Sequence, residues 1–162
     1  MTMKYFSKNE LNDFEFHDTV LSFESFSDNC LTLQATALNI HKSAEQNPHS
    51  TDMEISRARI SFEGVRFLSY KYREDIWKKG NDGNDMIEQG PEIILHDQDA
   101  SQRFLDQVKE WVRIYWLGLA ENGVYYMDAT SPENPFFTVL FTFNQIVIEW
   151  DDYKKEAWYV KS

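Results

Sequence analysis

Histidines close to carboxylates are the side chains in this sequence that are best suited to chemistry. His17 and Asp18 are adjacent within Phe-Glu-Phe-His-Asp, and an imidazole beside an acid can act as a general base or as a metal ligand. His41, His49 and Asp52 lie in or beside a later polar segment. Together the two groups offer nitrogen and oxygen atoms suited to a divalent metal, but their spacing matches no metal-ligand motif. We therefore predict no metal and no cofactor, with Asp18 orienting the His17 ring.

No enzyme motif accompanies these residues. The sequence has no glycine-rich phosphate loop, no paired CxxC sites, no HExxH helix and no nucleophile elbow, so we assign no catalytic residue. Cys30 is the only cysteine and has no basic neighbour that would activate its thiol, which predicts an inert packing residue. Asp82, Asn84 and Glu88 are oxygen donors, but they lack the spacing of the twelve-residue calcium loop, so we expect a flexible turn there.

Acidic and aromatic residues alternate near the end of the sequence. The cluster consists of Glu149, Trp150, Asp151, Asp152 and Tyr153. Exposed tyrosine and tryptophan anchor many protein interfaces, and surrounding acids steer a basic partner. The cluster is therefore our candidate partner-binding site. The alternative is that its aromatic residues pack the end of the chain back over a sheet.

The composition indicates a folded chain with a strong negative charge. Its 162 residues and 19.2 kDa match a single domain, residues 1–162. Apolar residues make up 42% and aromatic residues 15%, which excludes general disorder. The net charge of −11 opposes attraction to phosphate backbones and anionic lipids, so we expect neither nucleic acid nor membrane as a partner. The sequence has no signal-like start and no long apolar run, which predicts a soluble, cytoplasmic protein.

Short alternating, β-branched or aromatic runs predict that most of the chain is strand. They cover residues 21–26, 31–37, 56–62, 65–72, 92–96, 112–117, 124–127, 136–143 and 146–150. Turn-forming residues predict loops at 41–53 and 74–90, the second being the most mobile region. The predicted fold class is α+β, a mainly antiparallel sheet of about eight or nine strands with one helix packed on it. We place strand 136–143 at the centre of the sheet.

One helix is predicted to start near two acids that can cap it, Asp97 and Asp99, and to end near residues 110–112. Its apolar stripe consists of Phe104, Leu105, Val108, Trp111 and Val112. We expect Phe104, Val108 and Trp111 to pack on one face of the 136–143 strand. That face is formed either by Phe137, Val139 and Phe141 or by Phe136, Leu140 and Phe143.

Short motifs at the two ends of the chain carry a resemblance. Phe16-His17-Asp18 precedes an alternating strand, and Ile-Glu-Trp-Asp-Asp-Tyr closes the last strand at residues 148–153. This pattern resembles a group of small bacterial proteins, some of which are similar to immunity proteins encoded beside secreted toxins. The resemblance implies a non-enzymatic bacterial protein whose acidic surface neutralises a toxin, and a basic toxin would suit the charge of −11.

Three hypotheses for the function follow. The first is a non-enzymatic acidic binding protein, such as an immunity-type inhibitor of a toxin. The second is a small hydrolase or ligand-binding enzyme that uses the cluster of His17, Asp18, His41, His49 and Asp52. The third is a homodimeric structural domain whose sheet is covered by its own copy. Placement of His17 within hydrogen-bond or ligand distance of His41, His49 or Asp52 in a concave pocket would favour the second hypothesis, and a flat acidic, aromatic patch would favour the first.

Overall fold

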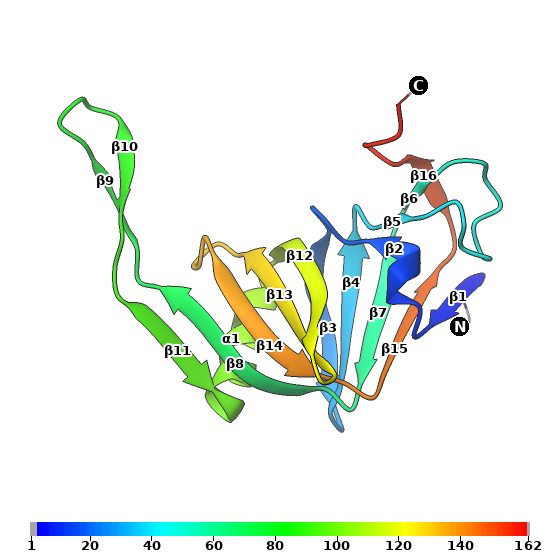
Figure 1. Ribbon diagram of the computed structural model, residues 1–162, viewed down its shortest axis with the longest axis horizontal. Coiled ribbons are helices and arrows are strands. Elements are labelled where there is room, and N and C mark those ends of the chain that lie inside the picture. Colours follow the sequence, from blue (N-terminus) through cyan, green and yellow to red (C-terminus); the bar gives the residue numbers. More distant parts are fainter. Residues whose placement is uncertain (1–2, 162) are drawn as a thin grey trace.

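One antiparallel sheet of ten strands dominates the computed structural model, which describes residues 3–161 (Figure 1). Its strands, in order across the sheet, are β1 (Tyr5–Lys8), β15 (Gln145–Trp150), β7 (Ala58–Glu63), β4 (Cys30–Thr36), β3 (Val20–Ser27), β12 (Val112–Glu121), β13 (Val124–Thr130), β14 (Phe137–Thr142), β8 (Arg66–Arg73) and β11 (Glu92–His96). The α+β class and the antiparallel sheet are confirmed. The predicted strand number was too low, because β1 is too short to show an alternating pattern.

Smaller elements flank the main sheet. A second sheet has the order β16 (Tyr153–Glu156), β6 (Met53–Ile55), β5 (Asn39–Ile40) and β2 (Phe14–Glu15), preceded by a 3-10 helix, η1 (Leu11–Asp13). Strands β9 (Ile76–Lys79) and β10 (Asp85–Glu88) form a hairpin in the segment predicted as a loop. The second-sheet strands have only two to four residues, so no periodicity reveals them. Their pairing depends on partners far away in the sequence.

Two tight turns meet at one corner of the main sheet. β7 leads into β8 through a turn at Gly64, and β14 leads into β15 through a turn at Asn144. In neither case do the two consecutive strands pair with each other in the sheet. Gly64 has a φ of +66°, and a Cβ there would collide with the Asn144 side chain. The sheet rolls on itself at this corner, at the bottom of Figure 1. As a result, the rings of Phe62 in β7 and Phe141 in β14 lie 5.6 Å apart.

The single α-helix, α1 (Asp97–Val108), packs on the inner side of the rolled sheet, mainly against β8. The Phe104 ring lies 5.2 Å from Phe67 and 6.3 Å from Phe137, and Val108 is fully buried. The helix therefore packs on the face that carries Phe137, one of the two predicted alternatives. The predicted end was too late, since the chain leaves the helix at Val108 and Trp111 is partly exposed.

Two details of the sheet differ from the prediction. β14 is the third strand from the β11 edge, and β3 and β12 lie at the centre. In β8, Phe67 and Tyr70 are both buried although strict alternation puts them on opposite faces. A bulge in the pairing of β14 with β8 shifts the register there and lets both rings point inward. Within residues 3–161, no helix is long and apolar enough to cross a membrane.

Candidate functional site

A cavity of about 550 Å³ contains residues from both predicted histidine groups. It lies between η1 and β2 on one side and β12, β13 and β15 on the other. His17 and His41 both line it, together with Glu10 and Glu15. Both histidines flank the short β2–β5 pair: the His41 backbone N–H donates to the Asp13 carbonyl beside the start of β2, and His17 follows the end of β2. The structure therefore brings together part of the predicted cluster in a concave pocket.

Asp52 holds the His41 ring in place. Its Oδ2 lies 3.0 Å from His41 Nδ1 and accepts a hydrogen bond from the Tyr159 hydroxyl at 2.8 Å, while Oδ1 accepts the backbone N–H of Lys42 at 2.7 Å. Burial alone would raise the pKa of Asp52, but these hydrogen bonds outweigh it and lower the pKa. An ionised Asp52 fixes the imidazole through Nδ1 and leaves Nε2 as the nitrogen free to meet a ligand.

The other predicted polar residues have structural roles. His17 Nδ1 lies 2.8 Å from the Tyr115 carbonyl oxygen, and its Nε2 lies 3.6 Å from Asp18 Oδ2. Asp18 has a φ of +68° and forms the turn into β3. His49 is outside the cavity, with its ring 5.1 Å from that of Tyr153. Among residues 3–161, no three His, Cys, Asp or Glu side chains are placed to hold a metal ion.

Only part of the acidic-aromatic cluster near the end of the chain is exposed to solvent. Trp150 is fully buried, stacked on Tyr5 with the ring centroids 5.6 Å apart. Tyr153 is half-buried and donates a hydrogen bond from its hydroxyl to the Gln46 carbonyl. Asp151 and Asp152 are exposed. Because Trp150 belongs to the core, it is not available as an anchor for a partner, and the packing alternative holds for this residue.

A projecting arm, residues 74–91, presents the apolar surface that the end of the chain lacks. The hairpin β9–β10 extends away from the body of the molecule, at the upper left in Figure 1. Its strands pair only with each other among the described strands. Exposed fractions are 59% for Ile76, 62% for Trp77 and 45% for Met86. On the edge strand β11 of the main sheet, Ile94 is also 50% exposed.

The arm also lies within an acidic part of the chain. Residues 74–99, the acidic segment, contain eight carboxylate side chains and two lysines, a net charge of −6 out of −11 for the whole protein. Both lysines are paired across the hairpin, Lys79 with Asp85 at 2.7 Å and Lys78 with Glu88 at 3.2 Å. Hydrogen bonds from the backbone N–H and side chain of Asn84 lower the pKa of Asp82. The arm therefore combines apolar side chains with excess negative charge.

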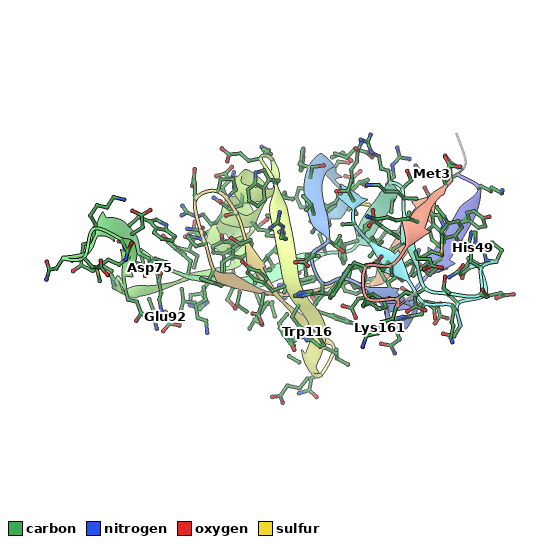
Figure 2. The ribbon with its side chains drawn as sticks, turned by 90° about the horizontal axis from the view of Figure 1, so that it is seen from above. Met3, His49, Asp75, Glu92, Trp116 and Lys161 are labelled. Atoms are coloured by element: carbon green, nitrogen blue, oxygen red, sulfur yellow. The ribbon has the colours of Figure 1, made fainter. Side chains whose placement is uncertain are left out.

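A groove of about 490 Å³ lies where the arm meets the outer face of the main sheet. Ile87 of the arm forms one wall, and Tyr115 and Phe136 form another, with their rings stacked 5.7 Å apart. Glu92 and Asp128 add carboxylates to its lining. In the view of Figure 2, Asp75 and Glu92 mark the base of the arm, and Trp116 lies near the middle of the molecule.

From its sequence the arm was predicted to be a mobile loop, and its exposed apolar side chains were not predicted. Glycines and short polar residues at 80–85 masked two four-residue strands. The available signal was the apolar content on either side, Ile76-Trp77 before the turn and Met86-Ile87 after it, which is unusual for a solvated loop. The fold and surface thus define an α+β protein with an acidic, partly apolar arm. Comparison with family models, with curated proteins and with solved structures finds no match.

Proposed function

We propose that this protein is a non-enzymatic binding protein whose arm holds a basic protein partner, as an immunity-type inhibitor of a toxin would. The observation that carries the proposal is an arm with exposed apolar side chains on both faces of its hairpin, Ile76 and Met86 on one face and Trp77 on the other, together with a net charge of −3 in residues 74–91. Large exposed apolar patches with charged surroundings are typical of protein interaction sites.

The energetics of the arm support this proposal. A lone two-stranded hairpin is marginally stable in water, and this one has no sheet to complete it. Its tryptophan is 62% exposed, so docking of a partner would bury much of that ring. Anchors of this kind contribute most of the binding energy at many interfaces. The unbound arm therefore lacks the apolar contacts that a partner would supply.

The charge favours a basic partner over a second copy of this chain. Two copies meeting through their arms would bring two segments of net charge −3 together, which is repulsive. A basic partner is instead attracted, and the acids increase the rate of encounter. The bacterial toxin class implied by the Phe16-His17-Asp18 resemblance fits this requirement. The protein is thus still proposed to be an acidic inhibitor, but its proposed binding site is the arm instead of residues 149–153.

The test uses the purified product of the neighbouring gene as the partner and measures association and dissociation rates by surface plasmon resonance. The variant Trp77→Ala/Met86→Ala should dissociate about 30-fold faster, since a hot-spot anchor contributes about 2 kcal/mol. Trp158→Ala is the control, because Trp158 is similarly exposed, at 60%, but lies near the C-terminus and outside the arm. It should leave both rates unchanged.

A second pair of variants separates the two acidic surfaces. Glu74→Gln/Asp82→Asn and Asp151→Asn/Asp152→Asn each remove two negative charges. The arm pair should slow association at low salt, and the difference should shrink at high salt, where charges are screened. A larger effect from the Asp151/Asp152 pair, or no binding of the partner to the parent protein, contradicts the proposal. Self-association that Trp77→Ala/Met86→Ala abolishes would identify a second copy as the occupant instead.

A further inference from the structure

We propose that the 550 Å³ cavity between η1–β2 and the β12–β13 hairpin is a binding site for a small organic cation, an amine or amidine carried on an aromatic or aliphatic body. This site is separate from the arm: none of its lining residues belongs to residues 74–99. Its volume lies within the range of about 300–1,000 Å³ that is usual for small-molecule pockets.

Aromatic and aliphatic side chains form much of the cavity wall. Tyr125 and Phe143 line it with their rings stacked 4.5 Å apart, and Leu117 and Ile146 lie beside them. These residues come from the inner faces of β12, β13 and the β14–β15 connection, which the rolled sheet brings together. The wall therefore suits an apolar or aromatic body, and its rings can also attract a cation through their faces.

The polar part of the lining favours positive charge. Glu10 and Glu15 line the cavity, and none of its described lining residues is lysine or arginine. The ring of His41 also lines the cavity, with its Nδ1 3.0 Å from Asp52 Oδ2. The two carboxylates match the N–H groups of an amine or amidine. An anionic ligand would meet two carboxylates here with no cationic side chain to balance them.

The polar wall is held in position before any ligand arrives. Asp52 fixes His41 and is itself held by Tyr159 and the Lys42 N–H. Glu15 accepts the His17 N–H at 3.1 Å, and the Asn9 side chain accepts the Ile146 N–H at 2.9 Å. Because His41 and Glu15 have fixed partners, a ligand need not order these two side chains, which reduces the entropic cost of binding.

The probes are phenethylamine, tryptamine and benzamidine, each compared with an anion of similar shape: phenylacetate, indole-3-acetate and benzoate. Isothermal titration measures affinity, and imidazole resonances in nuclear magnetic resonance spectra report contact with His41. At least one cation should bind about tenfold more tightly than its anionic counterpart, and it should shift the His41 resonances more than those of His49, which lies outside the cavity.

Two variants test the assignment of the site. Glu10→Gln/Glu15→Gln should weaken binding of the cation about tenfold. Glu88→Gln/Glu92→Gln removes the same charge elsewhere in the chain and should leave the affinity unchanged. Leu119→Arg places a cation at the cavity lining, on a side chain that is 59% exposed and so tolerates the change. It should abolish binding of the amine while the melting temperature stays the same.

Three results would overturn the proposal. They are failure of all three cations to bind, equal affinity for the anions, and equal loss of affinity in the two glutamine pairs. None of these outcomes bears on the arm, because the surface plasmon resonance experiment uses different residues and a different ligand. Conversely, a partner whose binding does not depend on the arm does not change the expected results of the cavity experiments.

Discussion

Replacing Asp52 tests how the loop at residues 41–52 is held beside the cavity. Asp52 accepts hydrogen bonds from His41, the Lys42 N–H and Tyr159 at 3.0, 2.7 and 2.8 Å. Buried bonds to a charged acceptor contribute about 1.5–3 kcal/mol each, and partial exposure lowers this toward about 1 kcal/mol. Asp52→Ala should therefore lower the free energy of unfolding by about 2–3 kcal/mol. Urea denaturation followed by tryptophan fluorescence measures this change.

A double-mutant cycle isolates the bond to Tyr159. Tyr159→Phe removes only that hydroxyl, which donates to Asp52 Oδ2, and should cost about 1 kcal/mol. In the Asp52→Ala background the same change should cost almost nothing, because the hydroxyl has already lost its acceptor. Costs that simply add would show that Asp52 does not hold the end of the chain, and would refute this account of the cluster.

The pH dependence gives an independent check. Hydrogen bonds lower the pKa of Asp52 in the folded protein below its usual value of 3.8. A carboxyl with a lowered folded pKa stabilises the fold above its unfolded pKa, and this contribution is lost as the pH falls through the folded value. The difference in unfolding free energy between the parent and Asp52→Asn should therefore be full at pH 6 and shrink below about pH 4. A difference that stays constant down to pH 2 contradicts the assignment.

Three further predictions concern the fold. Phe104→Ala should lower the free energy of unfolding by about 3–5 kcal/mol in urea denaturation, because the ring is buried between α1 and β8. Leu105→Ala should lower it by less, because Leu105 is only half-buried. Tyr70→Phe should cost about 1–2 kcal/mol by the same measurement, since the buried hydroxyl donates to Asn134 Oδ1 at 2.7 Å. A chelator should leave the melting temperature unchanged, because the 3–161 segment offers no metal-ligand group of three side chains; a lowered melting temperature would show a structural metal.

Local patterns in the sequence predicted the main elements. The alternating run 56–62 predicted a strand, and β7 (Ala58–Glu63) buries every second residue of it, Ala58, Ile60 and Phe62, whereas Ser56 is exposed. The apolar stripe with two leading acids located α1, although Asp97 and Asp99 lie in its first turn rather than capping it by a side-chain hydrogen bond. These features depend on residues within a few positions of one another, so they can be predicted without knowledge of the tertiary structure.

Bulges, short strands and corners escaped prediction for a physical reason. The register of β8 changes at a bulge that is set by its partner β14, so the burial of Phe67 together with Tyr70 cannot be read from β8 alone. The two-residue strands β2 and β5 are defined by their pairing, β2 with β5 and β5 with β6, all distant in the sequence. That His17 and His41 line the same cavity is likewise not indicated by any sequence spacing.

The sequence by itself determined the fold class, the positions of the longer strands and the helix, and a net charge of −11, because these follow from local periodicity and composition. Only the tertiary structure decided which aromatic side chains face solvent. Trp150 and Trp77 both stand in short strands beside charged residues, yet Trp150 is fully buried and Trp77 is 62% exposed. The difference arises because β15 lies between β1 and β7 in the main sheet, whereas β9 has only β10 beside it. Burial depends on what packs against a strand, and distant parts of the chain supply those contacts.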